Sequence, residues 1–138
     1  MPDIDFGQMS EALNNKTDRD LRNVDTTAKA DAVIDYQEPT AENGYTWYRK
    51  YKSGWVEQGG YYSGNITAGN NATINLIMPF ANTYYNISVT GEQNSNNWAY
   101  AVIKDSEITT SSFKVFVGAG NSSDKVKGVY WKACGFAQ

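Results

Sequence analysis

From Tyr45 onward the chain consists of short runs of aromatic and β-branched residues separated by Gly, Asn and Ser. This composition is typical of strands divided by turns. We expect strands at Thr46–Tyr51, Trp55–Gln58, Ala72–Met78, Tyr85–Thr90, Ala99–Lys104, Ser112–Gly118 and Gly128–Cys134. Alternation puts apolar side chains on one face in three of them: Ile74, Leu76 and Met78; Tyr85, Ile87 and Val89; Phe113, Val115 and Val117. Because no helical pattern separates these runs, the sequence predicts a mainly β domain, an antiparallel sandwich or barrel.

The segment before Pro39 has a different composition, with no aromatic residue between Phe6 and Tyr36. It is predicted to be helical or extended, and its apolar residues recur at spacings of three and four. They are Phe6, Met9, Leu13, Leu21, Val24, Ala28 and Ala32. So narrow a stripe does not stabilise a short isolated helix in water. We therefore predict an N-terminal arm at residues 1–38 that packs against other copies of the chain or against a β domain at residues 39–138, with a partly disordered arm as the alternative.

Composition argues against several classes of function. The chain has no histidine and a single cysteine, which removes His-dependent triads, internal disulfides and thiolate-rich metal clusters. A net charge of -3 provides no basic cluster for phosphate contacts, so no nucleic-acid partner is expected. The opening residues, MPDIDFGQ, lack the features of a signal peptide, and no later run is apolar enough to span a membrane. We expect a protein made in the cytoplasm, with no membrane insertion, no cofactor and no metal.

Four motifs after Pro39 follow one another in a recognisable order. They are SGWVEQGG at 53–60, INLIMPFANTYYNISVTG at 74–91, ITTSSFKV at 108–115 and VYWKACGF at 129–136. In this order they resemble the C-terminal, receptor-binding tip domains of bacteriophage tail fibres. The chain departs from the family pattern at Gly59, where the family often has Trp, and at Cys134, where Ile or Val is usual. The resemblance implies a small antiparallel β-sandwich at the distal tip of a tail fibre, assembled as a parallel homotrimer behind a segment that leads in from the shaft.

The first motif has a structural interpretation. The turn at Ser53 and Gly54 lets the strand from Trp47 reverse tightly, so that Trp55 pairs with an aromatic residue of the preceding strand. Two consecutive glycines, Gly59 and Gly60, permit a bulge or a close backbone approach. In the last motif, we expect Trp131 in the core and Cys134 as a small buried hydrophobic residue.

A tip that binds a surface polysaccharide needs exposed aromatic planes beside neutral amides. Two predicted loop segments, GGYYSGN and NSNNWAY, supply both. The candidate receptor-binding residues are Tyr61, Tyr62, Asn65, Asn94, Asn96, Asn97, Trp98 and Tyr100. Aromatic side chains lose little conformational entropy on binding. The alternative is that the four aromatic residues belong to the core or to a trimer interface, where the OH or N–H finds a partner.

Catalysis is not expected. Hydrolysis of a glycan needs two carboxylates across a cleft, and nothing in the sequence aligns Glu57 with Asp105 or Glu107. The leading hypothesis is attachment of a phage or prophage virion to a bacterial surface receptor, a glycan. A structural trimerisation or connector domain of the fibre is the second hypothesis, and a monomeric carbohydrate-binding module the third.

Overall fold

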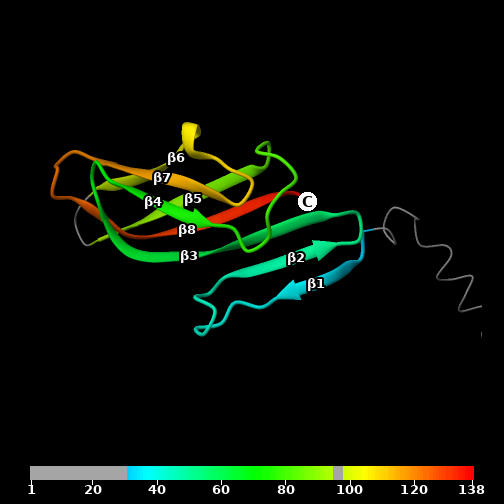
Figure 1. Ribbon diagram of the computed structural model, residues 1–138. Helices are drawn as coiled ribbons and strands as arrows, with labels where there is room; N and C mark the ends of the chain where they lie inside the picture. The colour runs from blue at the N-terminus through cyan, green and yellow to red at the C-terminus, as the bar shows by residue number, and fades with distance from the viewer. Residues whose placement is uncertain (1–30, 95–97) are drawn as a thin grey trace, which may run out of the picture. The chain divides into compact units, whose positions relative to one another are not determined.

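The computed structural model describes residues 31–94 and 98–138, which form two antiparallel sheets (Figure 1). The larger sheet has the order β1(Val33–Gln37), β2(Trp47–Tyr51), β3(Trp55–Thr67), β8(Lys125–Phe136) and β5(Asn86–Gln93). The smaller sheet has the order β4(Asn71–Asn75), β7(Ser112–Ala119) and β6(Ala99–Lys104), and the 3₁₀ turn η1(Asp105–Glu107) follows β6. The predicted mainly β fold and its antiparallel sandwich are confirmed. Residues 1–30 of the predicted arm lie outside the described residues.

The core fills the space between the two sheets. Phe113, Val115 and Val117 in β7 are fully buried, as their alternation predicts. On the opposite sheet Trp131 is 6% exposed, and its ring meets that of Phe113 edge-on, with centroids 6.0 Å apart. Trp131 therefore belongs to the core, as expected, and aromatic packing joins the two layers.

Strand β3 is longer than the sequence predicted. It was expected to end at Gln58, with Tyr61 and Tyr62 in a loop, but it continues to Thr67 and pairs with β8 along its length. Gly59 and Gly60 are typical of a turn in the sequence, but in the structure they lie within the sheet, where they allow close packing. A Cβ on Gly59 would lie 2.6 Å from the Trp131 carbonyl oxygen and 2.8 Å from the Trp47 ring. The expected close approach is therefore found, and the bulge in β3 lies further on, between Ser63 and Ile66.

Trp55 does not pair with an aromatic residue of β2. The Ser53–Gly54 turn forms as predicted, with the Gly54 N–H donating to the Tyr51 carbonyl at 2.9 Å and Gly54 at φ +93°. The ring of Trp55, however, packs edge-on against Phe136 of β8, with centroids 5.2 Å apart. Trp55 and Phe136 are direct partners in the β3–β8 register. Trp55 therefore forms its aromatic cross-strand pair with β8 instead of β2.

Three further expectations are corrected. Strand β1 lies within the segment assigned to the arm, and it pairs with β2 in the larger sheet. Strand β4 ends at Asn75, because Leu76 and Met78 turn into the β4–β5 loop while remaining packed against the core. Cys134 is half-buried rather than buried, because it lies opposite Glu57 and Asn86 on the outer face of the larger sheet.

The sandwich has two distinct ends. At one end lie residues 68–70 and 120–124, which connect strands, together with residues 94 and 98 (Figure 1). We call this the loop end. At the other end lie the β2–β3 turn, the β4–β5 loop and Phe136, and here β1 also begins, since Val33 pairs with Tyr51. We call this the turn end.

Candidate functional site

Two amides and one backbone contact tie the loop end together. The Ala68 N–H donates to the Asp124 carbonyl at 2.8 Å, which joins the β3–β4 and β7–β8 connections. The Asn94 amide donates to the Asn65 side-chain oxygen at 3.3 Å, which joins the end of β5 to the end of β3. The structure thus brings together two of the predicted receptor-binding residues from segments 29 positions apart. The predicted residues Asn96 and Asn97 lie outside the described residues.

A shallow hollow beside this contact is lined by neutral groups. Its volume is about 410 Å³, and its walls are Tyr62, Gly64, Asn65, Ile66, Thr67, Asn70 and Asn71. Tyr62 packs partly against the core and presents the rest of its ring to the hollow. The polar groups here are amides and hydroxyls, the groups that exchange hydrogen bonds with sugar hydroxyls without requiring a charge on the ligand.

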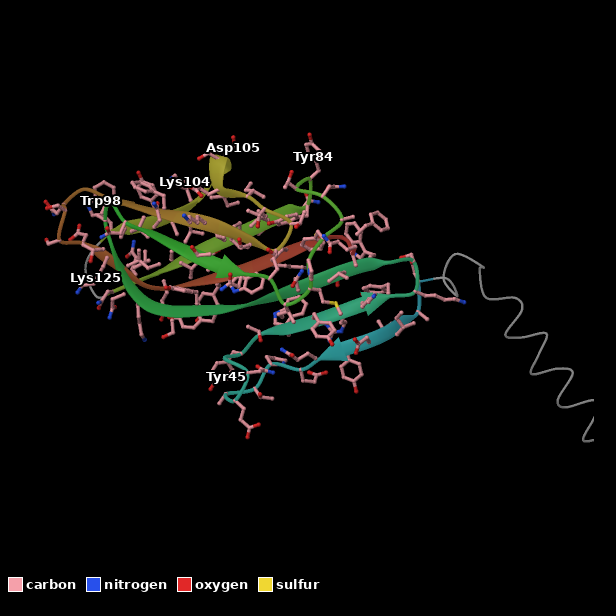
Figure 2. The ribbon with its side chains drawn as sticks, viewed as in Figure 1. Tyr45, Tyr84, Trp98, Lys104, Asp105 and Lys125 are labelled. Atoms are coloured by element: carbon pink, nitrogen blue, oxygen red, sulfur yellow. The ribbon has the colours of Figure 1, made fainter. Side chains whose placement is uncertain are left out.

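Trp98 and Tyr100 present broad aromatic surfaces to solvent. They are 63% and 51% exposed. Their rings lie over glycines: a Cβ on Gly120 would come within 2.6 Å of Trp98, and one on Gly118 within 2.5 Å of Tyr100. Tyr100 and Gly118 are register partners in β6 and β7, and Trp98 stands at the loop end, as does Lys125 (Figure 2). Each ring is thus supported on one side and open on the other.

Tyr61 lies apart from these residues, on the outer face of the larger sheet. Its hydroxyl donates to Glu92 at 2.5 Å, and its ring packs on that of Tyr130 with centroids 4.6 Å apart. The same carboxylate lies 3.7 Å from the Lys127 ammonium. The hydrogen bond to Glu92, assisted by burial, raises the pKa of Tyr61 to about 12. Tyr61 is therefore held by a local network and does not join the loop-end group.

The carboxylates considered for hydrolysis belong to different sheets. Glu57 lies in β3 and accepts a hydrogen bond from the Tyr51 hydroxyl at 3.3 Å. Glu107 follows β6 in the other sheet, between Lys104 at 3.7 Å and Lys114 at 3.3 Å. In residues 31–94 and 98–138 no three His, Cys, Asp or Glu side chains form a group able to hold a metal ion. This part of the chain also has no helix long and apolar enough to cross a membrane.

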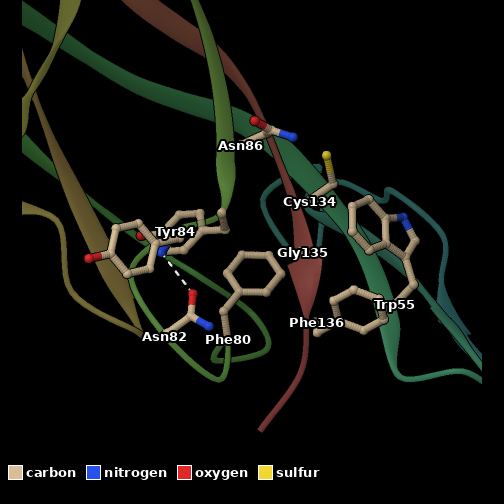
Figure 3. Close-up of a pocket in the computed structure, with 9 residues that line it drawn as sticks. Trp55, Phe80, Asn82, Tyr84, Asn86, Cys134, Gly135 and Phe136 are labelled. Atoms are coloured by element: carbon tan, nitrogen blue, oxygen red, sulfur yellow. Dashed lines mark hydrogen bonds between the residues drawn. The ribbon is translucent and has the colours of Figure 1, made fainter.

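Sequence reasoning missed a second pocket, at the turn end (Figure 3). It has a volume of about 240 Å³ and combines aromatic rings with two amides. Its walls are Trp55, Phe80, Asn82, Tyr84, Tyr85, Asn86, Cys134, Gly135 and Phe136. The sequence signal for this pocket is the alternation of Asn and aromatic residues in FANTYYN, within the second motif.

Comparison with solved structures finds pyocin tail fibres. The R1 pyocin fibre of P. aeruginosa superposes with a TM-score of 0.52 at 10% identity, over 76% of this chain and 29% of that chain. The N-truncated R1-type fibre gives a TM-score of 0.52 at 12% identity, over 76% of this chain and 88% of that one. The N-truncated R2-type fibre gives 0.49 at 18% identity, and this chain covers 39% of its length. No protein-family model and no curated protein sequence matches the chain.

The two superpositions on R1 fibres, each with a TM-score of 0.52, establish a shared fold. The two-sheet architecture described above is the feature that this chain shares with them. The chain spans less than half the length of the R2-type fibre chain and of the longer R1 fibre chain.

Proposed function

We propose that this chain is part of a phage or prophage tail fibre and attaches the virion to a bacterial surface glycan through its loop end. One observation carries the proposal. Trp98 and Tyr100 are 63% and 51% exposed, and they lie with the Asn65–Asn94 amide pair at the end of the sandwich opposite the point where β1 begins at Val33. The chain enters the β domain at Val33, so the loop end is the end of the sandwich farther from this connection.

The chemistry of the loop end suits a glycan. Trp98 and Tyr100 offer rigid planes to the C–H faces of sugar rings, and Asn65 and Asn94 offer donors and acceptors to hydroxyl groups. The Asn65–Asn94 bond holds the two amides in place before binding, which reduces the ordering cost of association. Binding leaves the glycan intact: Glu57 lies in β3 of the larger sheet and Glu107 follows β6 of the smaller one, so they do not form a catalytic pair.

We further propose protein partners for the chain within the virion. The chain assembles as a parallel homotrimer and contacts other tail-fibre or baseplate proteins in the virion, after synthesis in the bacterial cytoplasm. Neither nucleic acid nor membrane insertion is involved. The observations that support this are the motif order and the shared fold with pyocin fibres.

The test compares single substitutions of exposed aromatic residues. Trp98→Ala and Tyr100→Ala should each weaken binding to host cells or to arrayed bacterial glycans about tenfold or more, because aromatic hot spots are worth about 2 kcal/mol or more in interfaces. The matched control is Tyr45→Asn, which removes a ring that is 56% exposed on the β1–β2 turn, away from the loop end (Figure 2). Asn tolerates the φ of +58° found at Tyr45. Wild-type binding by both loop-end variants, with assembly intact, would overturn the proposal.

A connector domain is the second candidate, favoured by strand β1. Val33, Ile34 and Tyr36 are 45%, 59% and 62% exposed on a strand at the edge of the sheet. Apolar side chains on an exposed edge strand are a feature that other chains cover. This candidate predicts that host binding survives every loop-end substitution and that loss of assembly follows changes in β1. A carbohydrate-binding module, the third candidate, predicts a monomer that binds glycans.

A further inference from the structure

The pocket at the turn end arises from a gap in the larger sheet. Strand β5 begins at Asn86, opposite Cys134, whereas β8 continues to Phe136. Beyond this point the β4–β5 loop takes the place of β5: Phe80 forms a bridge with Ala137, and the Ala81 N–H donates to the Phe136 carbonyl at 2.9 Å. Where a regular strand would fill the sheet, the loop leaves a hollow of about 240 Å³.

The floor of this pocket is rigid. Phe80 and Tyr85 are 1% and 8% exposed, and their rings lie 4.5 Å apart. The Tyr85 hydroxyl donates to the Thr109 carbonyl at 2.8 Å, which anchors the floor to the far side of the core. Gly135 is part of the same floor, since a Cβ there would lie 2.9 Å from the Cβ of Tyr85. The hollow is therefore formed before any ligand binds, which favours a binding site over an accidental surface depression.

The rim supplies aromatic planes and free amide groups. Phe136 is 57% exposed and packs edge-on against Trp55, and Tyr84 is 94% exposed. Asn82 accepts a hydrogen bond from the Tyr84 N–H at 2.8 Å, which leaves the Asn82 NH₂ group without a partner in the described parts of the chain. The Asn86 side chain likewise has no hydrogen bond within residues 31–94 and 98–138, and both amides line the pocket (Figure 3).

We infer that this pocket binds one ring of a neutral sugar. No residue of its wall is charged, so a phosphate, a carboxylate or an ammonium group has no counter-ion there. Pockets for drug-sized ligands measure roughly 300–1,000 Å³, so a hollow of about 240 Å³ suits a single ring. Sugar hydroxyls can exchange hydrogen bonds with the two rim amides while the C–H face of the ring lies on the aromatic rim.

This site is separate from the one proposed for receptor attachment. The turn-end pocket and the loop end lie at opposite ends of the sandwich, so one ligand ring cannot occupy both (Figure 1). The inference shares the ligand class of the proposed function but does not depend on its being correct.

The single cysteine of the chain provides a direct measurement. Cys134 lines the pocket and is half-buried, so a bound ring covers its thiol. The experiment measures the rate of alkylation of Cys134 in the full chain by iodoacetamide, alone and with glucose, galactose, mannose or N-acetylglucosamine. At a concentration about ten times its Kd, a sugar that occupies the pocket lowers the rate about tenfold. Binding at the loop end leaves this rate unchanged.

Two sets of variants complete the test. Asn82→Ala with Asn86→Ala, which removes exposed side chains, should abolish protection by the sugar, and Trp98→Ala should preserve it. Absence of protection by all four sugars overturns the inference, and so does protection that survives the double substitution. A rate that falls with protein concentration in the absence of sugar also overturns it, because a second copy of the chain would then cover the pocket. Loss of host binding in Trp98→Ala is scored separately, so failure of one proposal does not mask the other.

Discussion

Gln58 binds both backbone polar groups of Met78. Its Nε2 donates to the Met78 carbonyl at 2.7 Å, and its Oε1 accepts from the Met78 N–H at 3.0 Å. The same Oε1 accepts from the Ile77 N–H at 2.8 Å. Gln58 is fully buried in β3, so this fork fixes the start of the β4–β5 loop against the larger sheet. The loop that carries Asn82 and Tyr84 is thereby held in position.

Replacing this side chain should destabilise the fold strongly. Gln58→Leu keeps the approximate volume but leaves two N–H groups and one carbonyl without a partner in a partly buried place. We expect the free energy of unfolding in urea to fall by about 3 kcal/mol, because each unsatisfied buried group costs roughly 1–3 kcal/mol. The matched control is Gln93→Leu in β5, an exposed glutamine whose change should stay within about 0.5 kcal/mol. Equal values for the two variants would show that the fork contributes little.

The sequence predicts the β architecture well because the evidence for it is local. Alternation at Phe113, Val115 and Val117 identifies a strand buried on one face, and the structure confirms it. Gly59 is the opposite case. A glycine reads as a turn signal when only its neighbours in sequence are known, and its role depends on Trp47 and Trp131, which are brought to it by pairing across two different strands.

The sites were less predictable for the same reason. Composition identifies Asn65 and Asn94 as candidates, but their hydrogen bond depends on the pairing of β3 and β5 with β8. The turn-end pocket could not be predicted, because it exists only where β5 begins opposite Cys134, short of the end of β8 at Phe136. Local sequence carries no information about such a gap between strands that are distant in the chain.

Two glycine substitutions should differ in cost, although each places a methyl group too close to a neighbour. Gly59→Ala meets the Trp131 backbone oxygen at 2.6 Å, which cannot move without the sheet, so we expect a loss of about 2 kcal/mol. Gly118→Ala meets the ring of Tyr100 at 2.5 Å, and this exposed side chain can swing away. We expect Gly118→Ala to keep nearly wild-type stability while weakening glycan binding at the loop end, because the ring is displaced. Urea unfolding and glycan binding measured on both variants test this; equal stability losses would contradict it.

The oligomeric state is expected to depend on the arm. The whole chain should sediment as a trimer, and a chain beginning at Val33 as a folded monomer, because the narrow apolar stripe from Phe6 to Ala32 gains stability against other copies. The truncation must retain β1, since the Gln37 amide donates to the Thr46 carbonyl at 2.8 Å. A monomeric whole chain would contradict the trimer. A trimeric truncated chain would instead assign the contacts to the β domain.

Two tyrosines should make the fold sensitive to alkali. Burial raises the pKa of Tyr85 to about 12, and the hydrogen bond to Glu92 raises that of Tyr61 to about 12, from an ordinary value of 10.0. Below pH 10 both hydroxyls are neutral in the folded and unfolded chains, and the stabilisation is fully present. As the pH rises from 10 towards 12, the unfolded chain ionises first, so the free energy of unfolding falls.

The variant Tyr85→Phe isolates this effect. At pH 8 it should cost about 1 kcal/mol, the value of the lost hydrogen bond to Thr109. Between pH 10 and pH 12 it should lose less stability than the wild type, because one of the two raised groups is gone. Urea unfolding followed by Trp fluorescence at each pH gives both numbers, and Tyr84→Phe, at a residue that is 94% exposed, is the matched control. If the wild type and Tyr85→Phe lost the same free energy over this range, ionisation of Tyr85 would not be coupled to unfolding.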